Sequence, residues 1–302
     1  MRKALTLALS LFTVLAFGQE FTSDWSQFTE ASKIDRAKII GVTDTKVVVG
    51  LNVNSGKSQA KIIEHGLELD TYNEIPLAFK DERIVHVAIT GGTTKVYTAK
   101  LEGKSQTLYV RTVDGADIAE PQKVCSSKFP NSTFSFSESP NGGYLGVIAD
   151  APFIKGKNEE IETWIFDQNH NQKLEYKLAL KNDNRKIKIN VPVMSNTGVM
   201  FVLKRYRVGL DNNYFVFAID PATGGHLRKT LTLMGKRVAD VKYELDKDDN
   251  LHLAGFYVSS SYNIYEGCFY FKLDQTAKAT EFKQNAFTEE FLINAEGKKA
   301  YK

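Results

Sequence analysis

Three carboxylates lie close together in the sequence, at Asp150, Glu159 and Glu160. Hydrolysis of a glycosidic bond uses two carboxyl groups roughly 5 to 10 Å apart, one as a proton donor and the other as a base or nucleophile. These three residues are therefore the nearest candidates for a hydrolytic site. Acidic side chains in connecting loops are more commonly solvated charges, and the sequence assigns no residue a catalytic role.

Two segments place oxygen-bearing side chains at alternate positions, as calcium-binding loops do. The first contains Asp246, Asp248 and Asn250, and the second runs from Asp167 to Asn171. Both lack the glycine at the sixth position and the distal glutamate of a complete calcium loop. Aspartate and asparagine are also favoured in tight turns on backbone grounds alone. We therefore interpret both segments as turns and predict no metal site.

The segment from Gly50 to Ser58 nearly matches the glycine-rich loop that binds nucleotide phosphates. It has one residue too many between its glycines, and such a loop must lead into a helix. The residues that follow, Gln59 to Ile63, are typical of a strand. A loop between two strands explains the segment better, and no cofactor is predicted.

The histidines do not show the spacing of a zinc site. His86 and His252 lie in apolar segments that we expect to be second strands of their repeats, at equivalent places. Histidines with satisfied hydrogen bonds in the core explain both better than catalytic residues do. The chain also lacks a Gly-x-Ser-x-Gly nucleophile motif. Any serine triad would have to be assembled from distant segments.

The elements that would position these groups recur along the chain. Four acidic turns, at Asp114, Asp167, Asp220 and Asp274, recur at intervals of 53, 53 and 54 residues, and each follows an aromatic-rich stretch. A looser fifth copy precedes Glu64. A constant period near fifty residues indicates one supersecondary unit that is copied and stacked.

The third copy shows the unit clearly. Residues 133–138 alternate between polar and apolar side chains, and residues 144–149 form a continuous apolar run. Residues 160–166 and 173–178 supply two more strand-like segments, and turns rich in Asn, Asp and Gly separate the four. The pattern predicts an antiparallel meander of four strands.

Radial repetition of four-stranded antiparallel units is the sequence signature of a β-propeller. We predict an all-β propeller with about five recognisable blades, near residues 37–77, 78–127, 131–180, 186–234 and 238–284. The blades could form a five- or six-bladed ring or an incomplete larger propeller. A β-sandwich is the alternative, but it would not explain the constant period. No domain boundary is expected between Ala37 and Ala286.

The two N-terminal blades match the four-strand pattern less clearly. We expect Lys46–Leu51 and Arg83–Ile89 to be their apolar second strands. Such strands are buried between blades and therefore carry apolar side chains on both faces.

The phrase Phe-Ser-Phe-Ser-Glu-Ser-Pro-Asn-Gly-Gly-Tyr-Leu-Gly-Val at 134–147 resembles the Phe-Ser-Pro-Asp-Gly-Lys-Tyr-Leu turn of TolB-type and WD-like propellers. The whole chain is similar to exported Bacteroidota β-propeller proteins of unknown function. In those proteins a blade ending like Phe269–Asp274 precedes a Phe-x-x-x-Phe-Leu segment and lysines, as Phe287–Leu292 and Lys298-Lys299 do here. Further blades follow in that family, so the resemblance implies an exported propeller that is truncated at its C-terminus.

The first eighteen residues have the layout of a secretory signal peptide, with Arg2 and Lys3 before an apolar run from Ala4 to Phe17. We expect cleavage before Gln19. The run is shorter than the roughly twenty residues of a membrane helix. The mature chain is therefore expected to be exported to the periplasm, the cell envelope or the medium, without a transmembrane segment. Residues 19–36 and 287–302 are expected to flank the blades.

The net charge disfavours nucleic-acid binding, and the positions of the two cysteines disfavour a disulfide. Loss of Arg2 and Lys3 lowers the formal net charge from +3 to +1, and such a near-neutral chain is not typical of nucleic-acid binding. Cys125 and Cys268 fall in the second and fifth repeats, which do not touch in a stacked array. We expect two reduced thiols rather than a disulfide.

Two aromatic loops, expected at residues 206–214 and 259–267, are candidates for partner binding. Loops that join second and third strands gather on one face of a propeller, and tyrosine and arginine are enriched at interface hot spots. The predicted binding residues are Tyr206, Arg207, Asp211, Tyr214, Tyr262 and Tyr265.

The scarcity of catalytic and metal-binding patterns favours a binding function, since a fold alone supplies none. We predict a non-enzymatic, exported β-propeller that serves as a protein-binding or scaffold module in the periplasm or cell envelope. A glycan or a small molecule remains open as partner. The alternative is a carbohydrate-active or other hydrolytic propeller that uses carboxylates at the mouth of its channel.

Overall fold

The structure is a computed structural model. It describes residues 37–53, 60–67, 72–152, 154, 157–180, 188–189, 192–208, 211–233, 236–259 and 265–296. The expected signal peptide, the segment at 19–36 and Tyr262 lie outside the described residues, as does most of the loop at 50–58.

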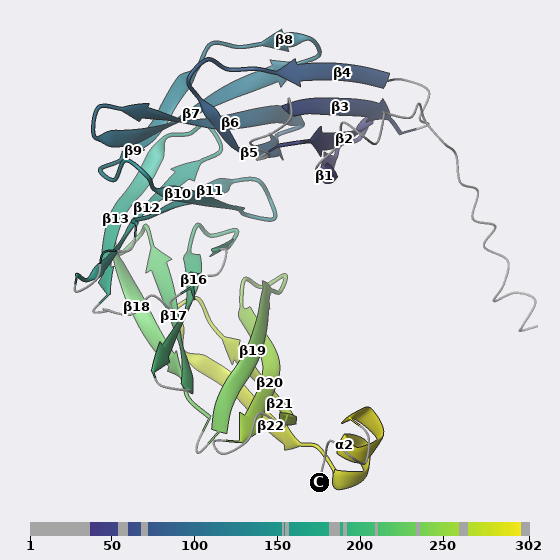
Figure 1. Ribbon diagram of the computed structural model, residues 1–302, viewed down its shortest axis with the longest axis vertical. Coiled ribbons are helices and arrows are strands. Elements are labelled where there is room, and N and C mark those ends of the chain that lie inside the picture. The colour runs from purple at the N-terminus through teal and green to yellow at the C-terminus, as the bar shows by residue number, and fades with distance from the viewer. Residues whose placement is uncertain are drawn as a thin grey trace, which may run out of the picture. The chain divides into compact units, whose positions relative to one another are not determined.

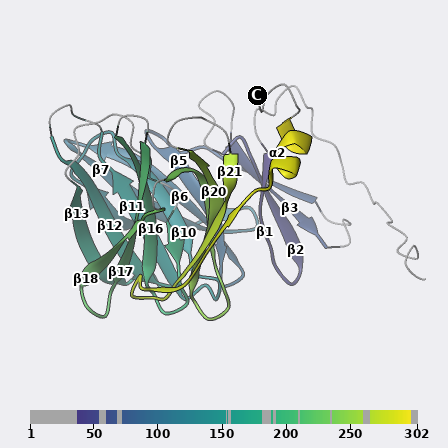
Figure 2. The same ribbon diagram turned by 90° about the horizontal axis from the view of Figure 1, so that it is seen from below.

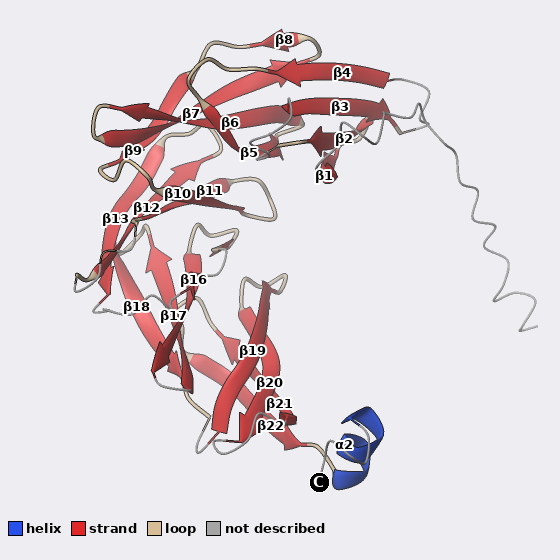
Figure 3. Cartoon of the chain, in the orientation of Figure 1, coloured by secondary structure: helices blue, strands red, loops and turns tan. Residues whose placement is uncertain are grey.

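Five antiparallel sheets follow one another along the described chain, and each sheet is a meander (Figures 1 and 3). The first comprises β1 (Ala37–Val42), β2 (Lys46–Leu51), β3 (Ala60–Gly66) and β4 (Tyr72–Leu77). The second comprises β5 (Arg83–Thr90), β6 (Thr93–Glu102), β7 (Ser105–Asp114), β8 (Asp117–Ile118) and β9 (Gln122–Ser127). The third comprises β10 (Thr133–Glu138), β11 (Tyr144–Asp150), β12 (Glu159–Asp167) and β13 (Gln172–Leu180).

The last two sheets repeat the same order. The fourth comprises β14 (Lys188–Ile189), β15 (Val193–Met194), β16 (Met200–Val208), β17 (Asp211–Asp220) and β18 (Gly225–Leu231). The fifth comprises β19 (Lys236–Leu245), β20 (Leu251–Ser259), β21 (Tyr265–Leu273) and β22 (Ala279–Ala286), and helix α2 (Glu289–Glu296) follows it. In the second and fourth sheets one of the four strand positions is split into two short strands. The predicted all-β fold of four-stranded antiparallel blades is confirmed.

The described chain divides between Ala78 and Phe79 into two compact units. The first unit contains the first sheet, and the second unit contains the other four sheets and α2. Composition does not mark this division, because a short connection without a Pro- or Gly-rich linker joins β4 to β5. The sequence analysis expected no boundary between Ala37 and Ala286, so this division was not anticipated.

Within the second unit, each apolar core is shared by two consecutive sheets. One core joins the second and third sheets around Tyr97 and Trp164. Another joins the third and fourth around Ile165 and Phe217. The last joins the fourth and fifth sheets, where Phe201 packs with residues of β20 and β21. Because both faces of the inner sheets are covered, their central strands carry apolar side chains on both faces.

The acidic residues of the repeat cap the turns that lead from the third strand to the fourth. The Oδ1 atom of Asp167 accepts a hydrogen bond from the amide of Asn169 at 2.9 Å. Asp220 and Asp274 accept equivalent bonds from the amides two residues ahead, at 2.8 and 2.9 Å. The acidic residue that recurs in the sequence thus marks the same hydrogen-bonded turn in each of these sheets.

Three local expectations were wrong. Arg83–Ile89 belongs to β5, the first strand of its sheet, because a turn at Gly91 and Gly92, both with positive φ, precedes the second strand β6. Glu64 lies inside β3 rather than at a turn. The loop expected between Tyr206 and Tyr214 is mostly strand, because β16 runs to Val208 and pairs with β17 from Asp211.

The described part of the chain contains no helix that is long and apolar enough to cross a membrane. Its helix α2 has only eight residues. The amide of Phe291 donates to the Oγ1 atom of Thr288 at 3.2 Å, and Leu292, which is 7% exposed, anchors the helix.

Candidate functional site

The structure separates the six predicted binding residues. Tyr206 and Arg207 pair with Asn213 and Asn212 across β16 and β17, and Asp211 begins β17. The side chains of Tyr206, Arg207 and Asp211 lie outside what the structure describes.

The two remaining described tyrosines differ in exposure. Tyr214 is 2% exposed and packs in the core between the fourth and fifth sheets, which corrects its assignment to a binding loop. Side chains alternate between the two faces of β17, and Tyr214 lies with Val216 and Ala218 on the face that the fifth sheet covers. Tyr265, at the start of β21, is 45% exposed and available to a partner.

Tyr265 belongs to an aromatic patch formed by Phe256, Tyr265, Phe287 and Phe291. The ring of Phe256 lies 5.7 Å from that of Tyr265 and 6.1 Å from that of Phe287, and Phe287 lies 4.7 Å from Phe291. Phe256 is 46% exposed and Phe291 is 51% exposed. Aromatic rings that contact one another and still face solvent are typical of a surface that binds a partner.

The chain places the patch at one end of the fifth sheet. The amide of Phe287 donates to the carbonyl of Glu266 at 2.8 Å, so β22 leads into α2 beside the start of β21 (Figure 2). Sequence analysis identified Tyr265 alone. Phe287 and Phe291 were noted only as part of a family resemblance; Phe287 lies between β22 and α2, and Phe291 lies in the first turn of α2.

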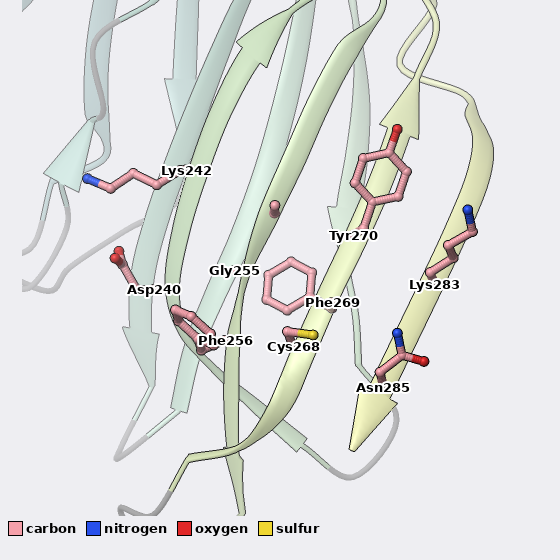
Figure 4. Close-up of a pocket in the computed structure, with 10 residues that line it drawn as sticks. Asp240, Lys242, Gly255, Phe256, Cys268, Phe269, Tyr270, Lys283 and Asn285 are labelled. Carbon is pink, nitrogen blue, oxygen red and sulfur yellow. The ribbon is translucent and has the colours of Figure 1, made fainter. Parts of the chain in front are cut away.

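Next to Phe256, the outer face of the fifth sheet contains a groove of about 420 Å³ (Figure 4). Its lining combines aromatic, small and charged side chains: Asp240, Lys242, Ala254, Gly255, Phe256, Cys268, Phe269, Tyr270, Lys283 and Asn285. Apolar hollows with a few charged groups at the edge are suited to binding.

A second arrangement could do acid–base chemistry. Asp150 at the end of β11 and Glu159 at the start of β12 approach Lys204 of β16 at the junction of the third and fourth sheets. Lys204 is only 2% exposed, and its ammonium group forms an ion pair with the carboxylate of Glu159. Glu160, the third predicted carboxylate, instead forms an exposed ion pair with Lys128.

Burial changes the pKa values of Asp150 and Lys204 at this junction. It raises the pKa of Asp150 to about 6, and the negative charge of Glu159 adds to the effect. Burial also lowers the pKa of Lys204, although the ion pair with Glu159 opposes that change. The Oδ1 atom of Asp150 is buried and has no hydrogen-bond partner among the described residues. An acid that keeps its proton near pH 6 can donate it to a ligand.

A polar hollow of about 510 Å³ lies at the junction of the second and third sheets, with Asp81, Arg83 and Asn131 in its lining. Glu82, also in the lining, is held by Arg111 through two hydrogen bonds of 2.7 and 2.9 Å. The hydrogen bond from Arg111 lowers the pKa of Glu82, so this carboxylate stays ionised and satisfied within the protein. It is a structural ion pair rather than a free catalytic group.

The histidines serve local contacts. His86 lies in the first strand β5 and stacks on Phe136 at 4.5 Å. His252 lies in the second strand β20 and contacts the carboxylate of Asp246 and the hydroxyl of Tyr270, each at 2.8 Å. The expectation that both histidines occupy equivalent second strands was therefore wrong.

The two calcium-like segments are hydrogen-bonded turns. Asp246 accepts bonds from the amides of Asp248 and Asn250 at 2.9 Å. Burial opposes ionisation of Asp246, but hydrogen bonds from His252 and Asn250 outweigh it and hold its pKa below the ordinary value. Among the described residues, no group of three or more His, Cys, Asp or Glu side chains is arranged to hold a metal ion.

Both cysteines are free thiols. Cys125 is buried in β9, and Cys268 is half-buried in β21. Burial raises the pKa of the Cys125 thiol above its ordinary value.

Comparison with solved structures found distant likenesses. The crystal structure of polysaccharide lyase Uly1 is 10% identical, with a TM-score of 0.49 over 89% of this chain and 75% of that chain. The WD40 domain of SCAP from fission yeast is 9% identical, with a TM-score of 0.45 over 86% and 66%. An oligogalacturonate lyase in complex with manganese is 7% identical, with a TM-score of 0.45 over 80% and 61%.

No family model matches the chain, and no curated protein matches it. Similarities this low assign no activity. The propeller-type blades are therefore assigned from the sheets and cores themselves.

Proposed function

We propose that this chain is a non-enzymatic, exported β-propeller that binds a protein in the periplasm or cell envelope. The aromatic patch of Phe256, Tyr265, Phe287 and Phe291 is the observation that supports this proposal. Three of its side chains are about half exposed, and Asp240, Lys242 and Lys283 flank Phe256 in the adjoining groove. Aromatic anchors surrounded by polar groups supply most of the binding energy in many protein interfaces.

Export is the second part of the proposal. The basic start of the chain and the apolar run that follows support it. Mass spectrometry of the protein recovered from its source should give a mature chain that begins at Gln19. An intact N-terminus in the cytoplasmic fraction would contradict export.

A pull-down tests protein binding. The mature chain, immobilised and exposed to solubilised envelope of its source, should retain one protein in stoichiometric amount. The double variant Tyr265→Ser/Phe291→Ser should lose it. Leu227→Ser removes an equally exposed apolar side chain, 53% exposed on β18, and should retain it. Equal retention by all three proteins, or no stoichiometric partner, would refute the proposed binding site.

The hydrolytic alternative is favoured by one observation, the proton that Asp150 holds up to about pH 6 beside Glu159. Two facts weigh against it. Glu159 is already neutralised by Lys204, and the two cavities described above do not include either carboxylate. Release of reducing ends from envelope polysaccharides by the wild type, but not by Asp150→Asn, would establish the alternative.

A further inference from the structure

The outer face of the fifth sheet includes two neighbouring rows of side chains that cross its four strands. Register pairs place Asp240, Phe256, Cys268 and Asn285 in one row. The neighbouring row contains Lys242, Ala254, Tyr270 and Lys283. Residues two apart on a strand point to the same side, and these eight residues are all exposed or half-exposed.

This face differs in chemistry from the corresponding face of the fourth sheet. The two sheets can be aligned by their equivalent turns between the first and second strands. In this alignment, the cross-strand pair Met200 and Ile219 of the fourth sheet corresponds to the pair Leu251 and Leu273 of the fifth. By this alignment, the positions of Phe201 and Ala218, both buried in the core, correspond to His252 and Lys272 in the fifth sheet. At these two positions, the outer face of the fifth sheet therefore carries polar side chains where the fourth sheet carries buried apolar ones.

The two rows nevertheless contain a hollow. Ala254 and Cys268 are small, and the strand register places them on one diagonal of the two rows, with the rings of Phe256 and Tyr270 on the other. Cys268, Phe256 and Tyr270 are labelled in Figure 4. In the first row the large side chain is on β20 and the small one on β21. In the second row this order is reversed. A two-fold rotation about an axis that runs across the strands, between the rows, would therefore place large side chains against small ones.

We propose that this face binds a second copy of the chain around such a two-fold axis. The rotation places each row over the other row of the partner copy, as an isologous interface requires. Phe256 then packs over Ala254 of the other copy, and Tyr270 packs over Cys268. The face is self-complementary in shape.

The charges on the face are self-complementary in the same arrangement. The rotation places Lys242 against Asp240 and Lys283 against Asn285 of the other copy. Lys242 forms no ion pair within the described part of the chain, so it is available for an intermolecular one. Opposite charges in this register favour the two-fold arrangement over one rotated about the strand direction, which would bring Lys242 against Lys283.

The size of the face sets the strength of the dimer. Four strands spaced about 4.8 Å apart and two rows of side chains cover only a few hundred Å² on each copy. Stable complexes bury about 800 Å² on each partner. We therefore expect a weak dimer that forms at high protein concentration and dissociates on dilution.

Sedimentation velocity of the mature chain from about 10 μM to about 1 mM should show reversible dimerisation, with affinity measured as a dissociation constant. Asp240→Lys and Lys242→Asp should each weaken the dimer at least about tenfold, because each variant opposes like charges. The double variant Asp240→Lys/Lys242→Asp should restore it. Ala254→Trp should abolish it by filling the hollow that receives Phe256.

Lys123→Asp, a charge reversal at an exposed position of β9, is the control and should dimerise as the wild type does. The substituted positions are exposed, so thermal unfolding of the monomers should be unchanged. A wild type that stays monomeric at the highest concentration, or a double variant that does not recover, would overturn the inference. Phe256 is left intact because it also belongs to the aromatic patch, so this result is independent of the proposed partner binding.

Discussion

Lys204 of the fourth sheet forms an ion pair with Glu159 of the third, and only 2% of the lysine side chain is exposed. An ammonium group at this depth requires a partner, because its desolvation costs several kcal/mol. Glu159 neutralises the lysine, and Asp150 nearby retains its proton up to about pH 6. The junction thus holds three ionisable groups where most neighbouring positions are apolar.

Removal of the lysine should destabilise the protein. Lys204→Met breaks the ion pair with the Glu159 carboxylate, which is 16% exposed, and should lower the free energy of unfolding by about 3 kcal/mol. Urea denaturation measures the change. The double variant Lys204→Met/Glu159→Leu should recover most of the loss. Lys128→Met breaks the exposed pair with Glu160 and should cost less than about 1 kcal/mol. Equal losses for the two single variants would refute this account of the junction.

Asp150 should make stability depend on pH in a defined direction. Its folded-state pKa of about 6 lies above the ordinary 3.8, so the folded protein binds this proton more tightly than the unfolded chain does. The resulting stabilisation is complete below about pH 4 and is lost as the pH rises through about 6. Glu159 and Lys204 are the charged groups that influence it.

Asp150→Asn removes this contribution. Relative to the wild type, the melting temperature of the variant should therefore rise between pH 4 and pH 7. Differential scanning calorimetry of both proteins at matched ionic strength provides the measurement. A constant difference across this range would show that Asp150 titrates normally.

Gly146 permits close contact between the third and fourth sheets. A Cβ atom at this position would lie 2.6 Å from the Cε atom of Met194 and 2.6 Å from the Sδ atom of Met200. Gly146→Ala should therefore destabilise the protein by about 1 to 2 kcal/mol, an amount limited by the flexibility of methionine. Gly225→Ala, where nothing lies within 4 Å of the added atom, should be nearly neutral in the same denaturation experiment. A neutral Gly146→Ala would mean that the sheets pack less closely.

The two thiols should react at very different rates. Cys268 is half-buried on the outer face of the fifth sheet, whereas Cys125 is 5% exposed and burial raises its pKa. At low protein concentration, one thiol should react with a disulfide reagent in the native protein, and the second only on unfolding. Cys268→Ser should abolish the native reaction, and Cys125→Ser should not.

Much of the fold could be predicted from local patterns. The spacing of Asp167, Asp220 and Asp274 reflects a hydrogen bond to the amide two residues ahead, a contact that depends on adjacent residues alone. The predicted order of a strand within its sheet was wrong where the local sequence pattern fitted two positions. The apolar run at Arg83–Ile89 fits a first or a second strand equally well, and only its partners decided between them.

The candidate site could be predicted much less well. Tyr214 and Tyr265 have the same residue type and both lie near a connection between strands, yet one is 2% exposed and the other 45%. Which face of a strand is covered depends on the neighbouring sheet, so exposure cannot be read from residue type.

The sequence by itself determined the repeat, its four-stranded unit and the turns, because each depends on contacts between residues close in the chain. Tertiary structure alone decided which charged groups meet, such as Glu159 with Lys204, and which aromatic rings gather, such as Phe256 with Phe287. These pairs are separated by 31 residues or more along the chain. Their proximity depends on strand register and on the stacking of sheets, which no local pattern specifies.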